Sequence, residues 1–122
     1  MNIDIIRDYC LSKKGVTEDF PFDADTLVFK VMGKMFALAP LEKFERGEAF
    51  LNLKCDPEYA LELRETYESI EPGFHMSKTH WNSLYLYKNE IQPKLLYELI
   101  DHSYKMVVKG MTKKLQDEFN NL

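Results

Sequence analysis

Two of the three histidines and the single tryptophan of this 122-residue chain fall within residues 73–82. His75 and His80 flank Lys78, and Trp81 follows directly. An imidazole titrates near neutral pH and can donate, accept or ligate, while an indole offers a broad face for stacking. With a lysine beside them, these side chains predict a functional surface.

The spacing of these residues disfavours metal binding and catalysis. Zinc ligands usually come as close pairs joined by a second pair, whereas no third or fourth ligand accompanies His75 and His80. Cys10 falls in the apolar stripe of a helix, where burial makes a thiol inert, and Cys55 has no partner at motif spacing. The five glycines are isolated and form no phosphate-binding loop. We therefore expect no catalytic residue, no metal and no cofactor, and an enzyme ranks third among the possible functions.

Charge is distributed unevenly along the chain. The net charge is −4, from 16 Lys and Arg against 20 Asp and Glu, yet residues 27–54 and 72–114 are each net positive. These two segments contain the two hairpins predicted below. Lys30 and Lys34 belong to the first hairpin and Lys78 to the second, so both could approach phosphate groups, although no dense lysine stripe is present.

The strands of the predicted sheet come in two groups. Leu27–Met32 and Met35–Ala39, separated by Gly33-Lys34, predict a hairpin with a glycine turn. A third strand is expected over 48–54, where Phe50 breaks the alternation of polar and apolar residues. A second hairpin is predicted to begin near Phe74, with its tip at residues 77–80 and its second strand over 81–87. The acidic and aromatic stretch 17–26 is expected to be a loop.

Helical periodicity predicts four helices. The first covers residues 3–14, the second begins after the N-cap and first-turn pair Asp56-Pro57, and the last covers 112–119. The long helix after Pro93 should bury one stripe and place His102 on its solvated flank. That stripe comprises Leu96, Leu99, Ile100, Ser103 and Val107. The expected element order is α-β-β-β-α-β-β-α-α, an α+β fold.

Length and hydropathy place the chain in a broad class. A chain of 122 residues suits a single domain spanning residues 1–122. The longest apolar run is short and broken by Pro40, so we expect neither an export signal nor contact with a membrane. Two cysteines are too few for a disulfide scaffold, and we expect a soluble cytoplasmic protein with reduced thiols. Nothing in the sequence sets an oligomeric state.

An ordered set of motifs resembles the MmcQ/YjbR family of small bacterial proteins. The resemblance covers nearly the whole chain, and its most specific part is the HxxKxHW pattern made by His75, Lys78, His80 and Trp81. The supporting motifs, in order, are YCLSKKGVTEDFPF, KVMGKMFAL, LNLKCDP, PGFHMSKTHWNSL and LIDHSYKMVVKG. The resemblance implies a CyaY-like, frataxin-like fold, with an antiparallel sheet of about five strands and helices packed on one face. It also implies a double-wing mode of DNA binding through the hairpin tips.

These observations define one candidate surface with two uses. Its residues are Lys30, Lys34, His75, Lys78, His80 and Trp81. The leading function is weak, salt-sensitive DNA binding. The alternative is a small anionic ligand or a protein partner at the His75, Lys78 and His80 surface. Trp81 is expected to serve more as a structural anchor than as a stacking platform.

Overall fold

The computed structural model describes residues 2–122 as helices, strands and one short 3-10 helix. In chain order these are α1 (Ile3–Leu11), β1 (Val16–Asp19), β2 (Thr26–Val31), β3 (Lys34–Pro40), α2 (Leu41–Glu45), β4 (Phe50–Lys54), α3 (Pro57–Thr66), β5 (Ile70–Pro72), β6 (Trp81–Tyr85), η1 (Leu86–Lys88), α4 (Pro93–Lys109) and α5 (Lys113–Asn120).

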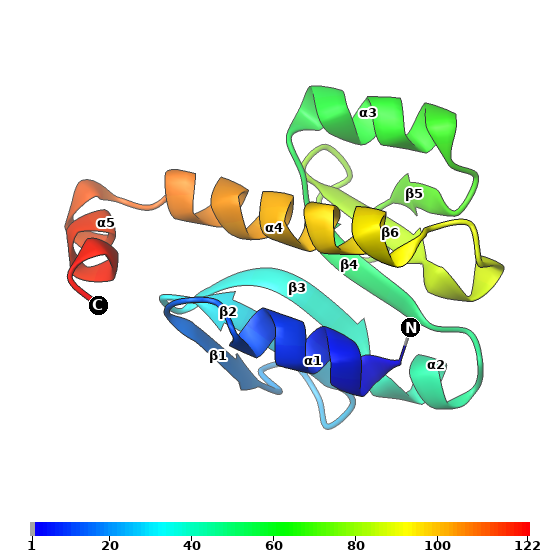
Figure 1. The fold of residues 1–122 in the computed structure, drawn as a ribbon, viewed down its shortest axis with the longest axis horizontal. Helices are drawn as coiled ribbons and strands as arrows, with labels where there is room; N and C mark the ends of the chain where they lie inside the picture. The colour runs from blue at the N-terminus through cyan, green and yellow to red at the C-terminus, as the bar shows by residue number, and fades with distance from the viewer. Residues whose placement is uncertain (1) are drawn as a thin grey trace.

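The strands of residues 2–122 form one antiparallel six-stranded sheet in the order β1-β2-β3-β4-β6-β5. Figure 1 shows α1 and α4 lying side by side across the sheet. The two helices are joined by the Tyr9 hydroxyl, which donates to the Asp101 carboxylate at 2.7 Å. Side chains of α1, α3 and α4 share a single core with the same face of the sheet. The predicted α+β class, with helices on one face of an antiparallel sheet, is confirmed.

The β2–β3 hairpin is confirmed, with its turn one residue earlier than predicted. Val31 pairs with Lys34, so the turn residues are Met32 and Gly33. Their φ angles are 51° and 79°. Positive φ at both central positions is the requirement of a type I′ turn, which matches the twist of the flanking strands. Lys34 therefore opens β3.

A β-bulge in β3 brings the sheet and α4 together. The register shifts beyond Phe29, so that Phe36 and the neighbouring Ala37 are both fully buried in the main core. The Ser103 hydroxyl of α4 donates to the Phe36 carbonyl and accepts the Lys54 N–H at 2.9 Å. A serine on an otherwise apolar stripe thus satisfies backbone groups where β3 and β4 separate.

The apolar stripes of the helices are largely as predicted. The buried residues of α4 are Leu96, Leu99, Ile100, Ser103 and Val107, the stripe derived from helical spacing. The Asp56 carboxylate accepts the Tyr59 N–H at 3.1 Å, and Pro57 opens α3, so this helix start is confirmed.

Two elements were missed because they carry little apolar periodicity. Residues 17–26 were expected to be a loop, but their first part belongs to β1, an edge strand of four residues. β1 is held by Arg7 of α1, whose Nε and Nη2 atoms donate to the Glu18 carboxylate at 2.8 and 2.6 Å. The other missed element is α2, which is too short to show a helical period.

The second hairpin differs most from its prediction. Its first strand is β5 (Ile70–Pro72), not a strand starting near Phe74, and residues 73–80 form an eight-residue connection. We call this connection the β5–β6 loop. β6 ends at Tyr85, where the chain turns into η1. The loop passes over the face of the sheet that carries no helix, which we call the open face.

Candidate functional site

The β5–β6 loop is fastened to the open face by a buried pair of polar side chains. The Phe74 N–H donates to Ser83 Oγ at 2.8 Å, and Asn52 Nδ2 donates to the Phe74 carbonyl at 3.1 Å. The Ser83 hydroxyl in turn donates to Asn52 Oδ1. Asn52 and Ser83 are 6% and 0% exposed, so these bonds are shielded from water. Both backbone groups of Phe74 are therefore fixed by β4 and β6.

The start of the loop requires glycine for lack of space. A Cβ atom at Gly73 would lie 2.7 Å from the Trp81 Cβ and 3.0 Å from the Met76 Cβ. The Gly73 N–H donates to the Trp81 carbonyl at 2.8 Å, and the Gly73 carbonyl accepts from Lys78 Nζ at 2.7 Å. The Lys78 ammonium is thus folded back onto its own loop while the residue as a whole stays exposed.

Arg64 of α3 closes the loop from the other side, a role that the sequence did not reveal. Its Nε atom donates to Asn82 Oδ1 at 2.7 Å, and its Nη2 atom donates to the carbonyls of Lys78 and, at 3.3 Å, Trp81. The Arg64 guanidinium thus links α3 to Lys78 in the loop and to Trp81 directly after it. Arg64 stands among glutamates on a polar helix face, so no local pattern marks it as an anchor.

Trp81 lies in a small second core on the open face. It is 8% exposed and packs with Val28 and Leu38, while Met35 and Met76 cover the cluster. The indole is therefore placed as a structural anchor, in the role expected for it, and it leaves little ring surface for stacking on a base.

The remaining predicted site residues are divided between the two hairpins. His75, Lys78 and His80 lie exposed on the β5–β6 loop. Lys34 is exposed beside the β2–β3 turn, while the half-buried Lys30 pairs with Asp19 at 3.3 Å. Three of these residues therefore share one loop. Strand pairing shows where the two hairpins lie relative to each other.

Strand register places the two hairpin tips at one end of the sheet. Lys54, the last residue of β4, pairs with Trp81, the first residue of β6. β4 also runs antiparallel to β3, so its end lies toward the start of β3 and the β2–β3 turn. We call this end, with residues 32–34, 54 and 73–80, the tip end.

Lysines gather around the tip end. The Ser103 contacts fix α4 there, so the last turns of α4 continue past the sheet, and Figure 1 shows α5 beyond the same end. Lys14 lies beside it because its carbonyl accepts from the Tyr104 hydroxyl. The lysines placed at or past this end are Lys14, Lys30, Lys34, Lys54, Lys78, Lys105, Lys109, Lys113 and Lys114. The carboxylates placed with them include Asp19, which pairs with Lys30, and Asp56, Asp117 and Glu118.

His102 does not lie on a solvated flank, and that prediction was wrong. Its Nε2 atom accepts the Asp56 N–H at 3.1 Å, and its ring meets Tyr59 edge to face at 5.0 Å. Burial lowers the pKa of His102 below its usual value. The imidazole thereby holds the turn between β4 and α3.

The two cysteines are free and buried, and burial raises the pKa of each thiol to about 12. A thiol with so high a pKa is a poor nucleophile near neutral pH. Within residues 2–122, no group of three His, Cys, Asp or Glu side chains is arranged to hold a metal ion. No helix in that range is long and apolar enough to cross a membrane.

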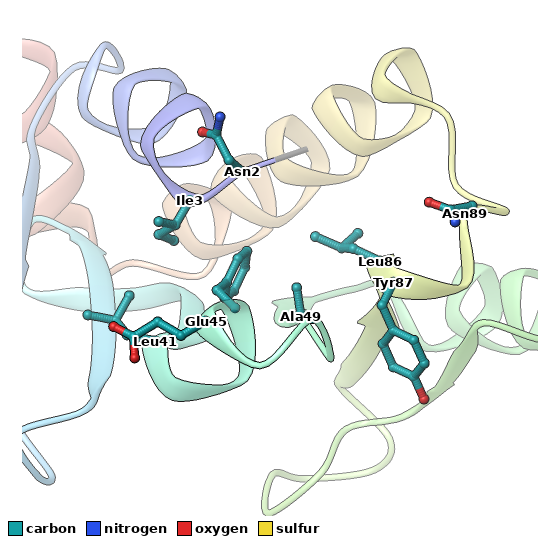
Figure 2. Close-up of a pocket in the computed structure, with 10 residues that line it drawn as sticks. Asn2, Ile3, Leu41, Glu45, Ala49, Leu86, Tyr87 and Asn89 are labelled. Atoms are coloured by element: carbon teal, nitrogen blue, oxygen red, sulfur yellow. The ribbon is translucent and has the colours of Figure 1, made fainter.

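A cavity of about 630 Å³ lies away from the tip end, between the start of α1, α2 and η1. Figure 2 shows Ile3 and Leu86 on opposite sides of it. A smaller cavity of about 310 Å³ lies on the open face, and His75 lines it. Of the predicted site residues, His75 alone lines either of these two cavities.

Known proteins match most of the chain. The YjbR family model matches residues 11–106. An uncharacterised Escherichia coli O157:H7 protein, YbdF, is 43% identical over 97 residues, which cover 80% of this chain and 76% of YbdF. The uncharacterised protein YjbR of Escherichia coli K12 is 31% identical over 108 residues, covering 88% of each chain.

Two solved structures share the fold. Deinococcus radiodurans protein DR2400 superposes with a TM-score of 0.86 and 38% identity, covering 98% of this chain and 88% of that one. A Pseudomonas syringae protein superposes with a TM-score of 0.70 and 30% identity, covering 87% and 98%. Together with the family match, these similarities show that the chain belongs to the YjbR family.

Proposed function

We propose that this protein binds nucleic acid weakly through its tip end, by contacts with the phosphate backbone. The observation that carries the proposal is that both hairpin tips lie at the same end of the sheet, where lysines from several elements gather. Two such tips could straddle a duplex as a pair of wings, while the lysines neutralise phosphates. The proposal places the protein in the cytoplasm, in keeping with its two free thiols.

The two tips would contribute differently. Lys34 is exposed, and no carboxylate within residues 2–122 lies within 4.0 Å of its ammonium. Lys30 would first have to leave Asp19, so its contribution is smaller. His75, Lys78 and His80 would make the contacts of the second tip, and Trp81 would act indirectly by holding that loop in place.

Salt dependence tests the proposal directly. Fluorescence anisotropy with a labelled duplex and a labelled single strand, measured over a series of KCl concentrations, should show affinity that falls steeply with salt. The log-log slope should be about −0.9 for each phosphate neutralised on duplex DNA. The slope of Lys34→Gln should correspond to about one fewer neutralised phosphate. The slope of the double variant Lys34→Gln with Lys78→Gln should correspond to about two fewer.

Lys94→Gln provides the matched control, since Lys94 is exposed at the start of α4, away from the tip end. It removes the same charge and should leave the slope unchanged. Absence of binding at low salt, or an equal loss in Lys94→Gln, would overturn the proposal. If inorganic phosphate at constant ionic strength displaces the DNA, a small anion is the better ligand for the His75, Lys78 and His80 surface.

A further inference from the structure

The smaller cavity on the open face has features of a ligand site that borders the tip end, with which it shares Phe74, His75 and Met76. Its volume is about 310 Å³, at the lower end of the range of small-molecule pockets, roughly 300–1,000 Å³. Two connections border it: residues 22–26, which precede and open β2, and the first half of the β5–β6 loop. Leu38, Pro40 and Phe50 line it from the sheet.

Phenylalanines line this cavity at its rim and at its floor. The rings of Phe50 and Phe74 are almost perpendicular, with an interplanar angle of 89° and centroids 6.0 Å apart. Phe50 is buried, whereas Phe74 is 50% exposed and Phe22, which also lines the cavity, is 64% exposed. Exposed large apolar side chains that surround a concave surface often mark a binding site.

An acidic side chain is among the residues that line the cavity. Asp23 lines it, and its carboxylate accepts the N–H groups of Asp25 and Thr26 at 2.9 and 2.6 Å and the Thr26 hydroxyl at 3.2 Å. These hydrogen bonds hold the pKa of Asp23 below its usual value, so the group stays ionised. Within residues 2–122, no lysine or arginine lines the cavity. Aromatic faces add further negative potential, because the ring quadrupole is negative above the ring.

A backbone constraint fixes the mouth of the cavity. His75 has a φ of +59°, in the left-handed region that side chains other than glycine rarely adopt. The neighbouring Phe74 is held by its hydrogen bonds to Asn52 and Ser83, and the centroids of the His75 and Phe74 rings lie 4.0 Å apart. Such local strain, held in place by a buried network, is typical of positions that a binding site pre-organises.

We propose that this cavity binds a small aromatic cation, with its ring among Phe22, Phe50 and Phe74 and its positive group toward Asp23. The His75 imidazole would donate to or accept from a polar substituent at the mouth. This inference goes beyond nucleic-acid binding, because the proposed ligand has the opposite charge, although His75 belongs to both surfaces.

Three probes that share one ring separate the contributions of charge and shape. ¹⁵N-labelled protein is titrated with phenyltrimethylammonium, benzyl alcohol or benzoate at constant ionic strength. Phenyltrimethylammonium should bind most tightly and benzoate least, and the largest amide shifts should fall in residues 22–26 and 73–76. Tighter binding of benzoate, shifts centred elsewhere, or no binding of any probe would overturn the proposal.

Two variants and a control locate the effect. Asp23→Asn keeps a side-chain oxygen for the turn but removes the charge, so the cation should lose its advantage over benzyl alcohol. Phe22→Ala, at an exposed position, should weaken cation binding by about two- to fivefold, the size of one exposed cation–π contact. Asp8→Asn, an exposed aspartate on α1, is the matched control and should bind as wild type does. An equal loss in Asp8→Asn would show that net charge, not the cavity, attracts the probe.

Discussion

The two hairpin tips occupy the same end of one sheet and are held in opposite ways. The β2–β3 turn has two residues, and a Cβ atom at Gly33 would meet nothing within 4 Å. Its shape is set by its own backbone, through the positive φ angles of Met32 and Gly33. Gly33 faces open space, and the neighbouring Met32 N–H donates to the Gly15 carbonyl at 3.1 Å.

The β5–β6 loop depends on side chains from elements far away in the sequence. Asn52 and Ser83 bind its second residue, and Arg64 binds its end. A hairpin tip at the same end of the sheet can therefore be specified by its own backbone or by tertiary contacts. A partner that displaced the loop would have to break buried bonds, whereas one that touched the turn would not.

Gly73→Ala should lower the free energy of unfolding most, because the loop has no room for an added Cβ atom at this position. The added Cβ would overlap the Trp81 and Met76 Cβ atoms, which are close to the backbone and cannot swing aside. We expect a loss of about 2–3 kcal/mol in the free energy of unfolding, as for other overpacked sites. Urea denaturation followed by Trp81 fluorescence measures it. A loss below that of Gly33→Ala would show that the loop is not packed as described.

The same contrast explains which parts of the fold the sequence could predict. The β2–β3 hairpin has strand-forming residues and a glycine turn within about a dozen residues, so local rules find it. The α4 stripe, Ser103 included, follows from helical spacing alone. β1 was missed because it is a short edge strand with little apolar periodicity, and its pairing with β2 and the contact of Arg7 with Glu18 are tertiary features that no local pattern contains.

Ser83→Ala tests how the side chains hold the loop. The change leaves the Phe74 N–H and the side-chain Oδ1 of Asn52 without their partner. We expect a loss of about 1–3 kcal/mol in the free energy of unfolding, the usual cost of an unsatisfied buried group. Ser77→Ala is the control in the same loop, since Ser77 is exposed and makes only backbone hydrogen bonds within residues 2–122. Equal losses in both variants would contradict the role of Ser83.

The candidate site was only partly predictable for the same physical reason. Rare residue types marked the β5–β6 loop, and His75, Lys78 and His80 lie exposed on it. No local pattern indicated that Arg64 anchors the loop or that Asp23 and His75 line one cavity. Those relations join residues about 15 to 50 positions apart, and neither periodicity nor motif spacing carries such information.

Gly33→Ala should have a smaller effect than Gly73→Ala, with a different cause. Space is available, but alanine is strained at a φ of +79°. We expect a loss of about 1 kcal/mol, the cost of a left-handed conformation for a residue with a Cβ. Gly33→Asn should lose less than Gly33→Ala, because asparagine tolerates this region. The opposite order, measured by urea denaturation, would show that packing and not backbone strain limits the turn.

The smallest effect on the free energy of unfolding is expected at the turn between β4 and α3, where His102 accepts the Asp56 N–H. Burial lowers the pKa of His102 below its value of 6.5 in an unfolded chain, so between these two values the unfolded state binds more protons. The free energy of unfolding should therefore fall as pH is lowered through about 6.5. In His102→Gln, whose side-chain oxygen can still accept the Asp56 N–H, this dependence should shrink. The substitution leaves the exposed His75 and His80 in place. If the pH dependence of His102→Gln equalled that of the wild type, it would come from groups other than His102.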